Sequence, residues 1–282
     1  MNAVAELFGH PSDDRSVDWK SIVADQQCPF LGRKCYKVRK SDPQTSIGSC
    51  TVLHGRQRAP ILICPARLLE RRQVFTDCLH LLTAHEPGNE LHVVPEVPVP
   101  GGSVDHFLLS ARAREIKDFV GIELQTLDTT GTVWPERQRL LRRHGVADRN
   151  GMELSSKPFG MNWKHTAKTT LVQMLHKVET FEHLNKRLVL VLQDRLLEYM
   201  QRNFAFGHLR PAETGDAMHF HAYGVEVNAA SSNRFSLRER LSTDAEGIAV
   251  GLGLRADPRV ELSEIHDTLT SKIGPTTLFS PA

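Results

Sequence analysis

The pattern of apolar and polar positions predicts long helices and strands in the middle of the chain. Apolar residues recur with helical spacing at 65–85, where Pro65 suits a helix start, and again at 166–185. Three strands are predicted between these helices, at 90–97, 104–110 and 117–127. A further segment, 187–193, is apolar along most of its length, which is typical of a buried strand.

The other predicted elements are shorter. They are, in chain order, a strand at 59–63, a helix at 194–204 with Asp194 as its N-cap, a strand at 218–227, and helices at 237–241 and 262–271. Before residue 64, prolines and glycines are frequent and little regular structure is expected.

This order of elements predicts an α/β fold, with a mixed central sheet flanked by helices. Residues 65–226 are expected to form its core. Residues 1–64 form a loop-rich N-terminal segment, and 227–282 a C-terminal extension packed on the core.

Composition and charge limit the function classes only weakly. The 282 residues are 40% apolar and carry a net charge of +2, so any basic binding surface must be local. The N-terminus lacks the features of a secretory signal, and no segment approaches the roughly 20 apolar residues of a membrane span. We therefore expect a cytoplasmic protein without membrane contact.

Four cysteines lie in the turn-rich N-terminal segment: Cys28, Cys35, Cys50 and Cys64. In a reducing compartment a disulfide framework is not expected, and four thiolates on tight loops could hold one iron or zinc ion. Their spacing is not that of C-x-x-C pairs, so free buried thiols are the alternative. The fifth cysteine, Cys78, falls at a core position.

Three polar residues on neighbouring predicted strands suggest a catalytic centre. Asp105 follows the Gly101–Gly102 turn, and Glu123 and Gln125 share one face of the next strand. A carboxylate in an apolar strand is costly unless it is paired or bound to metal. If the strands form a hairpin, Asp105 approaches Glu123, and Mg²⁺ would offset their repulsion. The alternative is that Glu123 and Gln125 line a solvated face.

Asp105 followed by Glu123-Leu124-Gln125 resembles the PD-(D/E)xK nuclease signature, with glutamine where lysine is usual. The order helix, three strands, helix, strand is similar to the α-β-β-β-α-β core of that fold. The stretches 96–105 and 123–135 resemble the NotI group of type II restriction endonucleases. The resemblance covers about residues 28–226.

This resemblance implies a prokaryotic homodimer that cleaves double-stranded DNA with Mg²⁺ at a short palindromic, GC-rich site. It implies Asp105 and Glu123 as Mg²⁺ ligands, and it leaves the role of Gln125 open. It also implies an additional acid, Glu96 in preference to Glu90, and an iron-associated site formed by the four cysteines.

Two basic clusters are candidates for DNA contact, since phosphate neutralisation and guanine recognition favour lysine and arginine. The first, in 136–144, contributes Arg137, Arg139, Arg142 and Arg143; the second contributes Lys164 and Lys168. A solvated helix face is the alternative for each cluster. His219 and His221 share one strand face and are expected to be a core pair.

Two other functions compete with a restriction endonuclease. One is a repair or defence nuclease of the same fold without strict sequence specificity. The other is a non-catalytic, metal-stabilised DNA-binding protein, which the glutamine at position 125 favours. Discrete fragments from a long defined DNA would indicate the restriction enzyme, and intact plasmid the non-catalytic protein.

Overall fold

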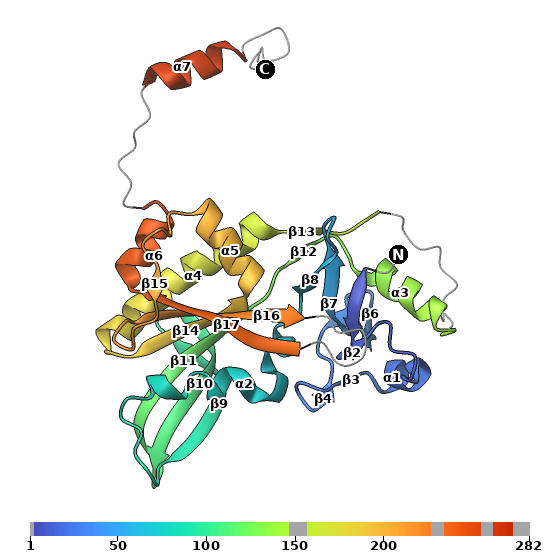
Figure 1. Cartoon of the computed structure of the whole chain (residues 1–282), viewed down its shortest axis with the longest axis horizontal. Helices are drawn as coiled ribbons and strands as arrows, with labels where there is room; N and C mark the ends of the chain where they lie inside the picture. Colours follow the sequence, from blue (N-terminus) through green and yellow to red (C-terminus); the bar gives the residue numbers. More distant parts are fainter. Residues whose placement is uncertain (1–2, 147–156, 227–233, 255–261, 273–282) are drawn as a thin grey trace.

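The structure is a computed structural model that describes residues 3–146, 157–226, 234–254 and 262–272. A seven-stranded mixed sheet forms its centre, in the order β15-β17-β16-β14-β11-β10-β9 (Figure 1). The strands β11, β14 and β16 are parallel neighbours, and the other pairs are antiparallel. The predicted mixed α/β fold with a large sheet flanked by helices is thus confirmed.

The central strands are β9 (Glu90–Val99), β10 (Gly102–Arg112), β11 (Glu115–Gln125), β14 (Arg187–Gln193), β15 (Arg210–Pro211), β16 (Met218–Glu226) and β17 (Arg234–Thr243). The predicted strands at 90–97, 104–110, 117–127, 187–193 and 218–227 correspond to five of these, although residue 227 lies outside the described residues. Strand β17, which follows the predicted core at 65–226, also belongs to this sheet and pairs with β16.

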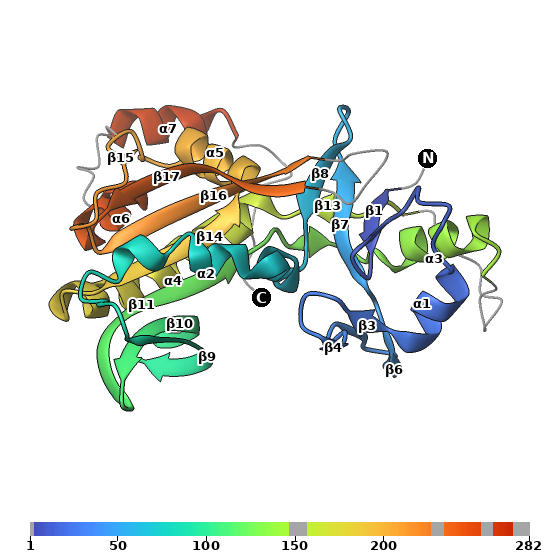
Figure 2. The ribbon, with the colours of Figure 1, turned by 60° about the horizontal axis from the view of Figure 1, so that its bottom comes forward.

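Helices cover both faces of the sheet (Figure 2). One face packs against α4 (Trp163–His183), α5 (Asp194–Asn203) and α6 (Ala245–Gly251). The other face packs against the turns η1 (Pro65–Arg72), α2 (Gln73–Thr76) and η2 (Leu79–Leu81).

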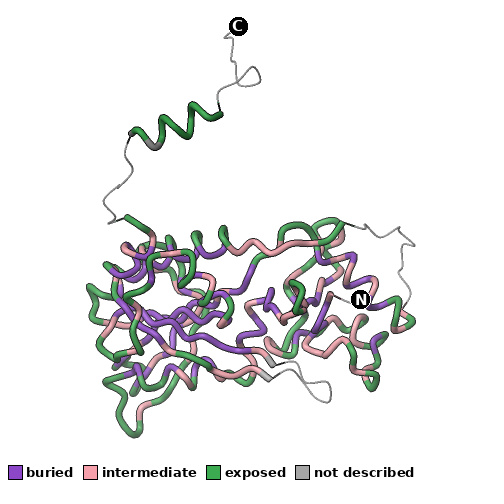
Figure 3. The backbone as a smooth tube through the Cα atoms, turned by 45° about the horizontal axis from the view of Figure 1, so that its top comes forward, coloured by how far each residue is buried: buried purple, intermediate pink, exposed green. Residues whose placement is uncertain are grey.

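Strand β14 shows how both faces are filled. Leu188, Leu190 and Leu192 belong to the same apolar cluster as the buried side of α4. Val189 and Val191 point to the opposite side and pack with the cluster that contains η1 and α2. Because both faces are covered, the middle of the sheet is buried along its length (Figure 3).

The N-terminal segment contains more regular structure than its composition predicts. A four-stranded sheet has the order β2-β1-β7-β8. The elements of this part are β1 (Val4–Leu7), β2 (His10–Pro11), α1 (Trp19–Asp25), β3 (Gln27–Cys28), β4 (Arg33–Lys34), β5 (Val38–Arg39), β6 (Asp42–Ser46), β7 (Ser49–His54) and β8 (Ala59–Leu62). The expectation of sparse structure was wrong because most of these strands are too short to show an alternating pattern.

Buried polar contacts join the N-terminal sheet to the rest of the protein. Gln193, at the end of β14, accepts a hydrogen bond from Leu62 N at 2.9 Å and donates one to Pro60 O at 2.8 Å. The buried Arg67 of η1 forms an ion pair with the buried Glu6 of β1 at 2.9 Å. The two sheets therefore share buried polar contacts.

The predicted long helix at 65–85 was wrong. Glu70 has ψ 127°, and Arg71 and Arg72 have positive φ values of 51° and 56°, so the chain breaks into short turns. Most of the apolar residues that suggested a helix, including Leu68 and Phe75, are still buried against the sheet, whereas Leu79 is exposed. The apolar periodicity predicted most of the buried residues correctly, but it did not predict the break in the helix at residues 70–72.

The helix predicted at 237–241 is also wrong. The predicted helix at 237–241 lies within strand β17, whose pairing with β16 extends from Met218↔Thr243 to Glu226↔Arg234. The remaining elements are β12 (Thr129–Thr130), α3 (Trp134–Arg143), β13 (Gly160–Met161) and α7 (Leu262–Thr270). Among the described residues, no helix combines the length and apolar character needed to cross a membrane.

Candidate functional site

The two acidic residues of the sequence motif lie opposite each other in the sheet. Strands β10 and β11 form the predicted antiparallel hairpin, with His106 opposite Ile122. Extending this register by one residue places Asp105 opposite Glu123. The Asp105 carboxylate also accepts a hydrogen bond from Leu124 N at 2.8 Å, so its position is fixed on β11.

A lysine that was not predicted from the sequence completes this group. Lys177 of α4 donates a hydrogen bond from Nζ to Glu123 Oε1 at 2.6 Å and another to Ser103 O at 2.6 Å. The side chains of Lys177 and Glu123 are 7% and 10% exposed, so the ion pair is almost fully removed from water. A buried carboxylate is thus paired with an ammonium group on the opposite layer.

The local packing of α4 explains how Lys177 reaches Glu123. Phe181 fills the space above Gly121, where an added Cβ would lie 2.4 Å from its ring. Four residues along a helix and two residues along a strand cover similar distances along the axis. Because Phe181 packs on Gly121, Lys177, one turn away on α4, therefore lies against Glu123, two residues away on β11.

The glycine turn before β10 also allows α4 to pack closely against the hairpin. Gly101 has a φ of +88°, and a Cβ there would lie 2.7 Å from the backbone oxygen of His176. A side chain at this turn would therefore push α4 away from the hairpin. The turn brings Ser103 O within reach of the Lys177 ammonium.

The sequence contained a signal for Lys177. The buried side of α4 includes Thr170, Met174, Lys177 and Phe181. A lysine at such a position must bury its ammonium or find a partner, because buried charges are paired. A lysine on the apolar side of a predicted helix is therefore a candidate partner for an acid on an apolar strand.

Burial raises the pKa of the Glu123 carboxyl to about 7. The hydrogen bond from Lys177 opposes this rise, and the neighbouring Asp105 carboxylate adds to it. A carboxyl whose pKa lies near neutrality can exchange a proton at ordinary working pH.

Gln125 takes no part in this group through its amide nitrogen. Its Nε2 donates a hydrogen bond to Thr126 O at 2.6 Å, so it caps the end of β11. The ammonium beside Glu123 comes from Lys177 of α4.

A cavity of about 290 Å³ adjoins Asp105. Its walls include Asp105 and His106 of β10 and Glu96 of β9. The N-terminal segment contributes Arg33 and Tyr36, both exposed. Asp105 thus belongs both to the buried group and to the wall of an open cavity.

The structure separates the two candidates for the additional acid. Val104 pairs with Val97 and His106 with Pro95, so Glu96 lies opposite Asp105 on β9. Glu90 lies at the far end of β9, opposite Ala111, with its carboxylate 3.3 Å from His92. Glu96 is therefore the acid beside the cavity.

The expected Mg²⁺ centre on Asp105 and Glu123 requires correction. Within the described ranges, no group of three or more His, Cys, Asp or Glu side chains could hold a metal ion. The positive charge that we expected from the cation is provided at Glu123 by the Lys177 ammonium.

The expected iron or zinc site is corrected by the same finding. Cys28, Cys35, Cys50 and Cys64 are all buried, but they do not form a ligand group in the described part of the chain. Burial raises the pKa of Cys28 and Cys35, which favours neutral thiols. A hydrogen bond from Cys50 lowers the pKa of Cys64 to about 6, but this concerns a pair of thiols. The cysteines belong to the apolar core of the N-terminal segment.

The arginines of the first basic cluster have different environments. Arg137 of α3 is 2% exposed and donates to the backbone oxygen of Ile47 at 2.7 Å, so its role is structural. Arg139 forms an ion pair with Glu136. Arg142 and Arg143 are exposed at the end of α3.

The second basic cluster lies on the first turns of α4. Lys164 and Lys168 are both exposed. Together with Arg142 and Arg143, they remain candidates for phosphate contact.

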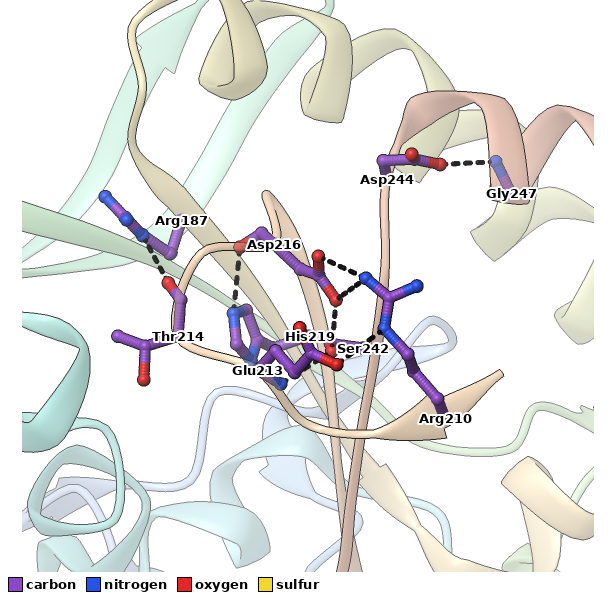
Figure 4. A network of polar contacts seen from close by, with 9 residues as sticks. All are labelled: Arg187, Arg210, Glu213, Thr214, Asp216, His219, Ser242, Asp244 and Gly247. Atoms are coloured by element: carbon purple, nitrogen blue, oxygen red, sulfur yellow. Dashed lines mark hydrogen bonds and ion pairs between the residues drawn. The ribbon is translucent and has the colours of Figure 1, made fainter. Parts of the chain in front are cut away.

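His219 and His221 of β16 are buried core residues. His219 Nε2 donates to Asp216 O at 2.9 Å, next to the Asp216 carboxylate that accepts from Arg210 and Ser242 (Figure 4). His221 Nδ1 lies 3.7 Å from Cys78 Sγ. One ring nitrogen of each histidine, His219 Nδ1 and His221 Nε2, has no hydrogen-bond partner among the described residues. The hydrogen bonds of His219 and Asp216 hold the loop before β16.

These histidines predict a loss of stability in acid. Burial lowers the pKa of His219 to about 4 and that of His221 to about 3. Both values lie below the unfolded value of about 6.5, so their contribution is complete above pH 6.5 and is lost as the pH falls toward 4. Each histidine adds up to about 1.4 kcal/mol per pH unit to the slope.

Urea unfolding between pH 7.5 and pH 4.5 measures this slope. His221→Leu, which removes one buried ring, is expected to flatten it. His165→Gln, which changes an exposed histidine of α4, is the control and should leave the slope unchanged. Identical slopes for the wild type and His221→Leu would contradict the prediction.

Comparison with known proteins places the chain in no family. No protein-family model matches it, and no curated protein sequence is significantly similar to it.

Proposed function

We propose that this protein is a DNA phosphodiesterase of the type II restriction endonuclease class, with Asp105, Glu123 and Lys177 at its reacting centre. The observation that carries the proposal is the buried Lys177–Glu123 pair, with Asp105 in register beside it. Two carboxylates and one ammonium are the residue types of the PD-(D/E)xK signature, and here the ammonium comes from the helix. The Lys177 ammonium supports the proposal although position 125 is glutamine.

The proposed chemistry assigns a separate role to each group. Phosphodiester hydrolysis needs an acceptor for the proton of the attacking water and positive charge near the phosphoryl oxygens. Glu123, with a pKa of about 7, is suited to take the proton. The Lys177 ammonium is suited to stabilise the developing negative charge. The water oxygen bonds to phosphorus as one of its protons passes to Glu123. The phosphorus–oxygen ester bond breaks, and the leaving oxygen takes up a proton from solvent.

The cavity beside Asp105 supports an extended anionic substrate. Arg33 lines it with Asp105, so a phosphate there would contact a guanidinium group. The exposed Arg142, Arg143, Lys164 and Lys168 supply further charge for phosphates outside the cavity. Cleavage of a palindrome would require two copies of the chain related by two-fold symmetry.

The proposal is tested by incubating a long, defined double-stranded DNA with the purified chain and sequencing the fragment ends. Parallel reactions contain EDTA or a divalent cation, so the cation requirement is measured directly. Identical ends at a short palindrome would support a restriction endonuclease. Random ends would indicate a nuclease without sequence specificity, and intact DNA in every reaction would refute the proposal.

Light scattering of the chain with and without DNA tests the dimer. A mass corresponding to two chains on one duplex is expected. Specific cleavage by a chain that remains monomeric on DNA would contradict this part of the proposal.

A further inference from the structure

A second cavity, of about 480 Å³, lies between the N-terminal sheet and the segment that follows β11. Its lining from the N-terminal segment is Lys37, Val38, Ile47, Ser49 and Ile63. Leu127, Asp128, Val133 and Trp134 are among the residues that line it from the other side. The group formed by Asp105, Glu123 and Lys177 makes no use of this cavity.

Some chain segments line both cavities. Tyr36 lines the first cavity and Lys37 the second. Leu124 and Leu127 are related in the same way, and three residues of chain span at most about 10 Å. A molecule whose phosphate lies beside Asp105 could therefore place an adjoining group in the second cavity.

One residue that lines this cavity has a polar side-chain atom without a partner. Ser49 of β7 is 3% exposed, and its hydroxyl makes no hydrogen bond within the described part of the protein. Such a group is costly to leave unsatisfied, so a ligand that hydrogen-bonds to it would recover that cost.

The rest of the wall combines apolar surface with hydrogen-bonding groups. Ile47, Ile63 and Leu127 provide apolar contact. Lys37 offers an ammonium donor, and the exposed Asp128 offers a carboxylate acceptor. A flat ligand with apolar faces and a polar edge matches this combination.

The cavity is also held in shape by its neighbours. The guanidinium carbons of Arg39 and Arg137 each lie 4.6 Å from the centre of the Trp134 ring. Arg137 is anchored in turn by the backbone oxygen of Ile47. The wall at Trp134 is therefore positioned before any ligand binds.

We propose that this cavity binds a single nucleobase turned out of the DNA duplex. The inference rests on the proposed function, because the adjoining phosphodiester is the one held beside Asp105. A nucleobase has apolar faces and a donor–acceptor edge, and enzymes that act on DNA can extrude a base into such a pocket. Ser49 and Asp128 contact its polar edge, and the apolar residues contact its faces.

Calorimetric titration of the full chain with dAMP, dGMP, dCMP and TMP tests the binding. Saturable binding of at least one nucleotide is expected. Ser49→Ala should weaken it about tenfold, because the lost bond is buried. The same variant should unfold at the same or a higher urea concentration, since an unsatisfied hydroxyl is removed.

Ser110→Ala provides the matched control. This buried hydroxyl bonds to His85 and Asn89 outside the cavity, so its removal should lower stability without changing nucleotide affinity. Failure of all four nucleotides to bind would overturn the inference. Unchanged affinity in both Ser49→Ala and Asp128→Ala would do the same.

A duplex with one bulged 2-aminopurine separates this inference from the proposed function. Binding should change the probe's fluorescence in the wild type, and the change should be lost in Asp128→Ala. DNA cleavage without nucleotide binding would overturn the cavity assignment and leave the proposed function standing. Nucleotide binding by a chain that leaves all DNA intact would support the cavity assignment and remove the proposed function.

Discussion

Replacing Lys177 with methionine is expected to reduce DNA cleavage by about 10³-fold and to destabilise the protein by about 3–5 kcal/mol. Methionine retains an unbranched apolar stem, so packing against the hairpin is largely preserved while the ammonium is lost. The Glu123 carboxyl then lies buried without its partner, and its pKa should rise above the present value of about 7. Single-turnover cleavage measures the first effect, and urea unfolding measures the second.

A double variant distinguishes the chemical role of Lys177 from its structural one. Lys177→Met with Glu123→Gln leaves no buried unpaired carboxylate, so much of the lost stability should return while cleavage stays absent. Lys168→Met, on the exposed side of the same helix, is the control for stability and should change it little. Full cleavage activity in Lys177→Met would refute the role proposed for this residue.

The second large effect is expected at the carboxylates. Asp105→Asn and Glu123→Gln should each lower the cleavage rate by about 10²–10⁴-fold, because the acid–base group or its charged neighbour is removed. The amide replacements keep nearly the same shape, and an amide oxygen at position 105 can still accept from Leu124 N. DNA affinity should therefore change little. Plasmid cleavage and gel-shift titration measure the two quantities separately.

Glu115→Gln is the matched control for these variants. Glu115 lies on the same strand as Glu123, but its carboxylate is exposed and pairs with Lys117 at 2.7 Å. Its replacement should leave cleavage unchanged. Unaltered cleavage in both Asp105→Asn and Glu123→Gln would show that the reacting centre lies elsewhere.

The metal expectations show a limit of reasoning from residue types. Two carboxylates on neighbouring strands need a positive charge, and four cysteines in a loop-rich segment suggest a shared ion. The first need is met at Glu123 by Lys177, which is 54 residues away in the sequence. The four cysteines are of the right residue type to bind an ion. They are buried in the core, but they do not form a ligand group among the described residues.

The basic clusters show that residue type alone does not predict which charged side chains are exposed. Arg137 and Arg143 stand in one basic segment, yet Arg137 is buried against Ile47 and Arg143 is exposed. Their difference depends on how α3 lies against the N-terminal segment. The local sequence of α3 does not predict that contact.

The sequence by itself determined the central strands β9, β10, β11 and β14 and the helix α4. Their long apolar patterns are local and depend on the repeat of the backbone. It also determined that Glu123 and Gln125 share a face and that Asp105 follows a glycine turn.

Only the tertiary structure decided which charged groups meet and where the chain breaks. The turns at 70–72, the N-terminal sheet, the Lys177–Glu123 pair and the cavity beside Asp105 all depend on packing between distant segments. Such contacts are set by burial and by the pairing of buried charges, which act in space and not along the chain.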